Sequence, residues 1–269
     1  TLVARRLQSR HRPPIIYTVH LSDLALNGPR RWVSDFGDFT HVASAEARRW
    51  TIEAGHVAPE RITLIPHGIN TSKFAMADES ARNSARHALG LAIDARVAAY
   101  VGRLDYPKNV DWLLDVAEAV PRLQLLIAGE GPDAPQLERQ ITRRALADRV
   151  HLLGQRDPLP IYQAADALLL PSLREGFSLV CAEAMAVGVA VLRTRTAGTE
   201  ELIVENITGR STPIDHDAFV QAATEFLALP DAVLLQMGDA ASSHVREYFT
   251  FERQLEQTLA LYRRVAQTP

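Results

Sequence analysis

Two glutamates, Glu175 and Glu183, stand eight positions apart in the segment PSLREGFSLVCAEAMA, residues 171–186. The apolar run before them predicts a buried strand, and the run LVCAEAMA predicts a helix over 178–187 because it is rich in good helix formers. Glu175 therefore falls on the strand-to-helix loop and Glu183 inside the helix. Such a helix start presents free N–H groups and the positive end of the helix dipole, so we expect it to bind a phosphate.

A diphosphate at this helix start would be held by backbone groups of Ser178, Leu179 and Val180. Glu183 lies five positions after Ser178, roughly 7.5 Å along a helix. It would then lie near an adjoining ribose, and Glu175 would face the group on the other phosphate. The alternative is that the two glutamates are unrelated surface and helix-face carboxylates.

Two cations follow another predicted strand, in the segment AAYVGRLDYPKNVDWLL. Arg103 and Lys108 lie after the strand, and we expect a helix to start near Asn109. In open α/β sheets, ligands bind at this carboxyl end of the strands. Arginine offers phosphate a planar fork and lysine a point charge. The alternative is a pair of solvated surface cations.

Short apolar strands alternate with helical stretches along the chain, which predicts parallel βαβ units and a doubly wound sheet. The expected strands are IIYTVH, THVAS, ITLIP, VAAYVG, LQLLIAG, VHLLG, ALLLP, VAVLR and a weaker one near TGRSTP. The expected helices are 44–55, 79–89, 109–119, 134–146, 178–187, 216–228 and 250–266. The last has apolar residues at helical spacing, namely Phe251, Leu255, Leu259, Tyr262 and Val265.

Length and composition allow two domains, with 269 residues and 47% hydrophobic content. A net charge of −3 argues against a general nucleic-acid binder. The single cysteine, Cys181, permits no intrachain disulfide, and we assign it to core packing. The sequence shows neither a signal peptide nor an apolar run near the roughly 20 residues of a membrane span. We expect a cytoplasmic protein, and the start at Thr1 rather than Met suggests a fragment.

The sequence gives little support for a metal site or for a catalytic nucleophile. The nine histidines show no tight ligand spacing. The run Asp215-His216-Asp217 matches a DxD metal motif, but it precedes an amphipathic helix, so we expect it to cap that helix. The sequence has no phosphate-binding Walker motif and no GxSxG motif. We therefore predict no metal site and no cofactor.

The segment with the two glutamates resembles the EGFGLVxxEAMA motif of retaining glycosyltransferases with the GT-B fold. This family includes the glycogen synthases and many mannosyl and glucosyl transferases. The segment VGRLDYPKN resembles the family's VGRLxxxKG motif. The resemblance implies that Arg103 and Lys108 stabilise a departing diphosphate. It also implies that Glu183 holds the ribose diol and that Glu175 orients the sugar hydroxyls.

Three further segments carry weaker resemblance. VHLLGQRDPLPIYQAAD resembles a family segment whose loop borders the nucleobase, which implies base contacts for Gln155 and Arg156; a purely structural loop is the alternative. TAGTEELI resembles GGxxEhI, so Glu201 matches the family carboxylate or is a helix-start carboxylate. YTVHLSD resembles the family's tvHD stretch, which places His20 near the transferred sugar or makes it structural. His67 in PHGIN is a further candidate for the interdomain cleft.

The segment ERITLIPHGINTSKF resembles the family's IPNGID linker between two Rossmann-like domains. The resemblance implies the second half of an N-terminal, acceptor-side domain over residues 1–68 and a linker over 69–74. A complete C-terminal nucleotide-sugar domain would span 75–245, and the helix in 246–269 would cross back. We thus expect an α/β chain of GT-B type whose N-terminal domain is incomplete.

The favoured interpretation is a retaining, metal-independent hexosyltransferase. It implies a UDP-, GDP- or ADP-sugar donor and a sugar, glycan, lipid-linked or small-molecule acceptor. The pattern offers no obvious carboxylate nucleophile, so it does not support double displacement. The resemblance implies front-face transfer, in which the acceptor attacks beside the leaving group. One alternative is a catalytically incomplete fragment or subunit that binds a sugar nucleotide. Another is a sugar-nucleotide epimerase of related fold.

Charge is unevenly spread, at +3 over residues 1–68 and −6 over the rest. Residues 1–12 contain no acid and four arginines, Arg5, Arg6, Arg10 and Arg12. Such a cluster suits peripheral contact with an anionic membrane at its inner face, and a lipid-linked acceptor. The alternative is a solvated helix end.

Overall fold

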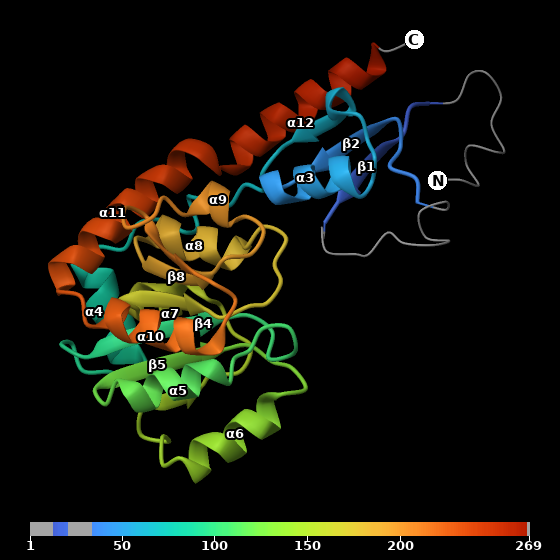
Figure 1. Ribbon diagram of the computed structural model, residues 1–269. Coiled ribbons are helices and arrows are strands. Elements are labelled where there is room, and N and C mark those ends of the chain that lie inside the picture. The colour runs from blue at the N-terminus through green and yellow to red at the C-terminus, as the bar shows by residue number, and fades with distance from the viewer. Residues whose placement is uncertain (1–12, 21–33, 268–269) are drawn as a thin grey trace.

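Two parallel sheets organise the computed structural model, which describes residues 13–20 and 34–267. Figure 1 shows the smaller sheet, with β1 and β2, beside α3 and α12, and the larger one among the remaining helices. The architecture confirms the predicted α/β class. The arginine-rich residues 1–12, and the membrane contact predicted for them, lie outside the described residues.

All nine predicted strands are present, with small shifts at their ends. The smaller sheet has the order β1-β2-β3 and the larger one the order β6-β5-β4-β7-β8-β9. The strands are β1 Ile16–Val19, β2 Phe39–Val42, β3 Ile62–Leu64, β4 Arg96–Val101, β5 Leu123–Ala128, β6 Val150–Leu152, β7 Ala167–Leu170, β8 Ala190–Thr194 and β9 Gly209–Thr212.

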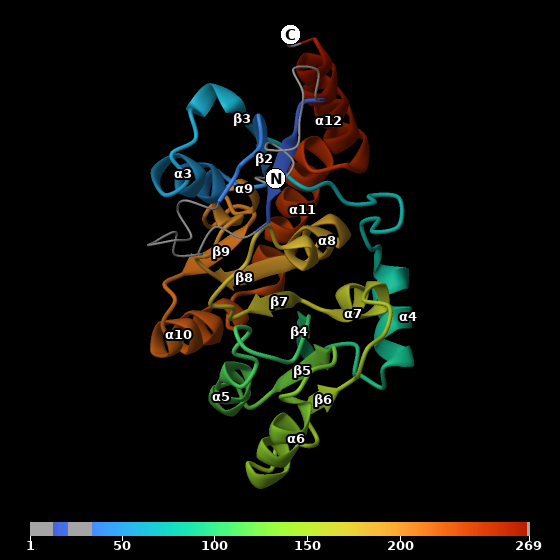
Figure 2. The same cartoon turned by 90° about the vertical axis from the view of Figure 1, so that its right-hand side faces the viewer.

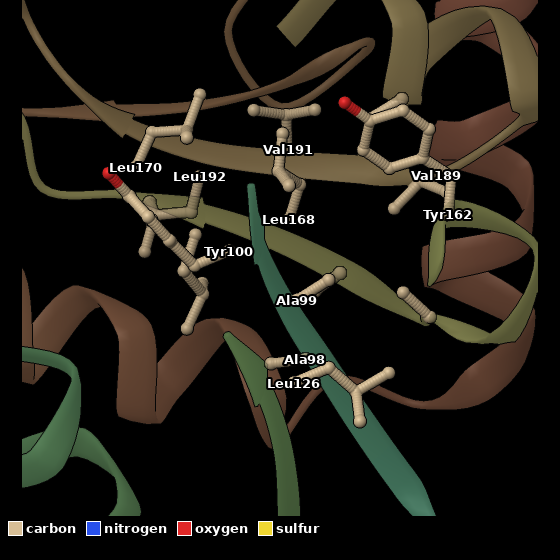
Figure 3. Close-up of a cluster of buried hydrophobic side chains, with 14 of the residues drawn as sticks. Ala98, Ala99, Tyr100, Leu126, Tyr162, Leu168, Leu170, Val189, Val191 and Leu192 are labelled. Atoms are coloured by element: carbon tan, nitrogen blue, oxygen red, sulfur yellow. The ribbon is translucent and has the colours of Figure 1, made fainter. Parts of the chain in front are cut away.

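Helices cover both faces of the larger sheet. Figure 2 shows α5 and α10 on one side and α4 and α7 on the other. All four residues of β7 are buried, as expected for a strand inside a parallel sheet. Figure 3 shows the apolar cluster between the sheet and these helices. It contains Leu168 from β7, Val191 from β8, Leu126 from β5 and Tyr162 from α7. This core fixes the carboxyl ends of the strands, where the candidate site lies.

The helices follow the predicted pattern, with three differences. They are α3 Ala45–Glu53, η1 Pro59–Arg61, α4 Glu79–Ala88, α5 Trp112–Ala119, α6 Ala134–Arg143, α7 Leu159–Ala164, α8 Leu179–Val187, α9 Thr199–Leu202, α10 His216–Leu227, α11 Asp231–Tyr248 and α12 Phe251–Ala266. The helix predicted from 109 begins only at Trp112, because Asn109 is left-handed with φ of 47°. Ala145 is also left-handed, so α6 ends before it. We did not predict η1, α7 or α11.

The predicted apolar face of the last helix is wrong for four of its five residues. Leu261 and Val265 of α12 are buried against Ile65 and the smaller sheet. Exposed fractions of 40–59% are found for Phe251, Leu255, Leu259 and Tyr262. The apolar residues of α12 cover a wider arc of the helix surface than the smaller sheet contacts. The sheet packs against only one edge of that arc. Helical spacing therefore identified the helix but not its packed side.

The chain crosses between the two sheets twice, once near residues 68–69 and once near residues 249–251. These two crossings are hydrogen-bonded to each other. The Ile69 N–H donates to the Phe249 carbonyl at 2.9 Å, and the Phe251 N–H donates back to the Ile69 carbonyl at 3.2 Å. A Cβ at Gly68 would lie 2.2 Å from the Thr250 carbonyl oxygen. Only glycine permits so close a backbone approach. The two crossings are therefore joined at one point.

No single described helix is long and apolar enough to cross a membrane. The α10–α11 pair reaches that length and composition only when the two are taken together, and they are bent by 107°.

Candidate functional site

Lys108 and Glu175 meet at the carboxyl end of the larger sheet. Strands β4 and β7 are parallel neighbours, so the loops that follow them converge. The Lys108 Nζ lies 2.8 Å from the Glu175 Oε1, and the side chains are 22% and 14% exposed. The buried Ser172 hydroxyl donates to the same Oε1 at 2.8 Å. Two residues predicted to contact a diphosphate and a sugar thus form one partly buried ion pair.

Arg103, Gln155 and Arg156 line a neighbouring hollow of about 530 Å³. Arg103 is 74% exposed, and its guanidinium lies 2.7 Å from the Asp105 carboxylate. The Arg156 side chain donates to the Leu153 carbonyl at 3.0 Å. The structure therefore places Gln155 and Arg156, which were predicted to contact the base, beside Arg103, one of the two cations predicted to contact phosphate.

The floor of this hollow depends on a glycine and a buried tyrosine. A Cβ at Gly129, where φ is 146°, would lie 1.7 Å from the Gly102 carbonyl oxygen, so no larger residue fits. The Tyr100 hydroxyl donates to the Arg103 carbonyl at 2.7 Å. Burial raises the pKa of Tyr100 above its usual range, which keeps the hydroxyl protonated as a donor. These contacts hold the backbone that carries Arg103.

The N-terminus of α8 is open. Ser178 is the N-cap residue, but its side chain makes no capping hydrogen bond within the part of the chain that the structure describes. Ser178 is buried, Val180 is half-buried and Leu179 is 45% exposed. The first-turn N–H groups have no acceptor inside the helix and remain available to an anion.

Glu183 lies away from the ion pair and faces α7. The Tyr162 hydroxyl donates to the Glu183 Oε2 at 3.0 Å. Burial raises the pKa of Glu183, while the bond from Tyr162 opposes that rise. Next to this pair, Lys73 and Asp157 form an exposed ion pair at 3.1 Å. The ribose contact expected of Glu183 stays a prediction.

Two histidines of the N-terminal part lie close to the glutamate loop. His20 is exposed at the end of β1, and a Cβ at Gly176 would lie 2.4 Å from its carbonyl oxygen. The His67 ring meets Phe177 edge-on, with centroids 5.8 Å apart, and burial lowers the pKa of His67. Both predicted histidines thus adjoin the segment that carries Glu175.

Glu201 lies in the first turn of α9 and also reaches across the gap between the two sheets. One of its carboxylate oxygens accepts from the Ala45 N–H, the first residue of α3. The other is buried and has no partner among the described residues, and burial raises the pKa of Glu201. Nearby, Arg49 makes a two-pronged ion pair with Glu200 at 2.7 and 2.9 Å. Glu201 thus lies at a helix start, as the alternative to the family carboxylate predicts, because it is in the first turn of α9, and it also accepts from the first N–H of α3.

The Asp215-His216-Asp217 run caps a helix, as predicted. The Asp215 carboxylate accepts from the Ala218 N–H at 2.9 Å at the start of α10. Across the described residues, no group of three or more His, Cys, Asp or Glu side chains is arranged to hold a metal ion. Cys181 is fully buried, which confirms its assignment to the core.

Sequence reasoning missed the two hydroxyl donors of the site. Ser172 stands three residues before Glu175, on a loop that was assigned no regular geometry. Tyr162 and Glu183 come from different helices, so only the packing of α7 beside α8 brings them together. The one available signal was the tyrosine in IYQAAD, which precedes the buried strand β7.

Two family models match the chain. The model described as glycosyl transferases group 1 matches residues 95–228, and the model described as glycosyltransferase family 4 matches residues 1–73. The D-inositol 3-phosphate glycosyltransferase of Corynebacterium urealyticum is 32% identical over 85% of this chain and 57% of the relative. The protein of that name from Mycobacterium avium is 30% identical over 86% and 56%. The chain thus spans a little over half the length of these relatives.

Solved structures confirm the GT-B fold. Sucrose-phosphate synthase from Thermosynechococcus elongatus matches with a TM-score of 0.83 and 25% identity, over 98% of this chain and 71% of that one. The Anabaena protein Alr3699/HepE in complex with UDP matches with a TM-score of 0.82 and 21% identity, over 99% and 74%. The fold is therefore that of a GT-B glycosyltransferase. The chain belongs to the family of glycosyl transferases group 1.

Proposed function

We propose that this chain carries the donor side of a retaining glycosyltransferase, which transfers a hexose from a nucleotide-diphosphate sugar without a metal ion. The observation that carries the proposal is the Lys108–Glu175 pair, at 2.8 Å, in which Lys108 comes from the loop after β4 and Glu175 from the loop that leads into the open N-terminus of α8. A cation and free N–H groups suit a diphosphate, and a carboxylate suits sugar hydroxyls. The names of the curated relatives and the UDP bound to Alr3699/HepE support the same chemistry.

In the proposed reaction, Arg103, Lys108 and the α8 N-terminus neutralise the charge that develops on the departing diphosphate. Glu175 orients the sugar through its hydroxyls, and Glu183 binds the ribose. The acceptor attacks on the face from which the diphosphate leaves. His20 would lie on the acceptor side, because it comes from the smaller sheet and adjoins Gly176.

A calorimetric titration with UDP, GDP, ADP and their sugars tests donor binding. We expect one nucleotide to bind and Arg103→Ala to weaken that binding by about 1.5–3 kcal/mol, as for a charge-assisted bond. Arg139→Ala is the matched control, since Arg139 is an exposed cation on α6. If no nucleotide binds, or if both variants retain wild-type affinity, the proposed phosphate site is wrong.

The two glutamates can be separated by the same titration together with a turnover assay. Glu183→Gln should weaken free nucleotide and nucleotide sugar alike, because its proposed partner is the ribose. Glu175→Gln should mainly lower turnover. Inositol 3-phosphate is the first acceptor to try, given the names of the relatives, and turnover should survive EDTA. Binding without turnover on any acceptor would favour the binding-subunit alternative, and an epimerised product without acceptor would favour the epimerase.

A further inference from the structure

Arg193 is a buried cation with no carboxylate beside it in the described chain. It is the penultimate residue of β8 and is 1% exposed. One terminal nitrogen, Nη2, donates to the Thr196 hydroxyl at 2.6 Å and to the Ala197 carbonyl at 3.1 Å. The remaining nitrogens, Nε and Nη1, are buried and have no hydrogen-bond partner among the described residues.

Such a charge is costly to the fold. Removing a guanidinium from water is strongly unfavourable unless an opposite charge or a full set of hydrogen bonds replaces the water. Only one of the three Arg193 nitrogens donates to an oxygen, both of its acceptors are neutral, and the remaining polar neighbour is the Cys181 thiol. A linear apolar side chain at this position would avoid that penalty. A buried guanidinium at this position therefore favours an anion close to it.

The guanidinium lies next to the open end of α8. Its charge acts on Cys181, in the first turn of α8, where it opposes the burial that raises the pKa of that thiol to about 11. Its bond to the Ala197 carbonyl reaches the loop before α9. In that loop, a Cβ at Gly198 would lie 3.0 Å from the Phe177 Cα, just ahead of the N-cap residue Ser178. Arg193 thus contacts both the first turn of α8 and the loop that supports its entry.

We propose that Arg193 is a positioning residue for the diphosphate of the donor. Its buried positive charge adds to the positive end of the α8 dipole, and its hydrogen bonds hold the loop on which Phe177 rests. The bound diphosphate supplies the negative charge that the site otherwise lacks. This inference rests on the proposed function, because it requires a nucleoside diphosphate at α8. A charge in a poorly solvated environment is weakly screened, so it can act on the diphosphate without touching it.

The test compares the nucleoside diphosphate with its nucleoside, which lacks the charged part. The nucleotide among UDP, GDP and ADP that wild type binds is titrated against Arg193→Met, Arg193→Lys and the control Arg195→Met. Arg195 lies just after β8 but is exposed. We expect Arg193→Met to raise the Kd of the diphosphate about tenfold, which corresponds to about 1.4 kcal/mol, because a weakly screened charge is lost. The Kd of the nucleoside should change less than about twofold.

The conservative variant and the melting temperature complete the test. Arg193→Lys should restore the diphosphate Kd to within about threefold of wild type, and Arg195→Met should match wild type. The Tm of Arg193→Met should equal or exceed that of wild type, since an unpaired buried charge is removed. An unchanged diphosphate Kd would overturn the inference. So would a lower Tm with equal weakening of diphosphate and nucleoside, which is the signature of a structural role. If wild type binds none of the three nucleotides, the proposed function itself fails.

Discussion

At the scale of single residues, the site keeps its charges paired before any ligand arrives. Lys108 already contacts Glu175, while the Arg103 side chain is mostly exposed and forms its ion pair with Asp105. A diphosphate bound as proposed would therefore share Lys108 with a carboxylate, whereas it would recruit the exposed Arg103 at little cost. The two cations, alike in the sequence pattern, should contribute differently to stability.

Lys108→Ala is expected to lower the free energy of unfolding by about 1–3 kcal/mol, because it leaves a partly buried carboxylate unpaired. Arg103→Ala should change it by less than about 0.5 kcal/mol. The double variant Lys108→Ala/Glu175→Gln should be more stable than Lys108→Ala alone. Urea denaturation of the four proteins measures these differences. Equal destabilisation by Lys108→Ala and Arg103→Ala would show that the ion pair does not stabilise the fold.

At the scale of elements, α9 and α3 form the side-chain link between the two sheets. Glu201 accepts from the first N–H of α3, and its neighbour Glu200 pairs with Arg49. The second contact is exposed, with both side chains at least half accessible to water, so it should contribute little. The first one satisfies a helix N-terminus and is partly buried.

Glu201→Ala should therefore weaken the start of α3 more than Glu200→Ala does. We expect the opening free energy of the first turn of α3, measured by hydrogen exchange, to fall by about 0.5–2 kcal/mol, as for a lost N-cap. Glu200→Ala should lower it by about 0.2–1 kcal/mol at most. Protection of α3 that is the same in both variants and in wild type would rule out the link.

Most strands were predictable from sequence because they are short apolar runs between polar turns, whereas β9, with the sequence GRST, gives only a weak signal. Helix limits depended on contacts that no local pattern contains. The Asn109 side-chain amide donates to the Pro171 carbonyl at 3.1 Å, and Asn109 is left-handed, which delays α5. Helix α11 carries Gly238 at its centre, a poor helix former. A Cβ there would lie 1.9 Å from the Gly188 carbonyl, so packing against α8 requires the glycine.

The site was predictable only as far as local motifs extend. Glu175 and Lys108 were found because each belongs to a recognisable segment beside a strand end. Glu201 was found too, but its partner Ala45 lies 156 positions away. Arg193 sits inside a strand that reads as ordinary core, and nothing in its neighbours signals an unpaired charge. Pairings of this kind follow from topology, which the sequence pattern describes only in outline.

At the scale of the whole molecule, the two crossings meet at Gly68 and Thr250. Gly68→Ala should lower the free energy of unfolding by about 1–3 kcal/mol, because a methyl group would collide with the Thr250 carbonyl. Thr71→Ala, in the same crossing, should stay within about 0.5 kcal/mol of wild type. Thermal and urea unfolding provide the measurement. A Gly68→Ala protein as stable as wild type would show that the crossings can separate freely.

Because the two crossings are hydrogen-bonded to each other at Ile69, they act as a hinge. The two sheets should resist sliding past each other but remain able to rotate about this junction. Rotation would swing the smaller sheet, with His20, away from Gly176. The hollow with Arg103, Gln155 and Arg156 belongs entirely to the larger sheet and would turn as a rigid unit. Base recognition should thus be insensitive to the angle between the sheets, whereas sugar and acceptor alignment should depend on it. If the proposed function holds, a nucleotide would stay bound at every angle between the sheets, whereas transfer would occur at only one.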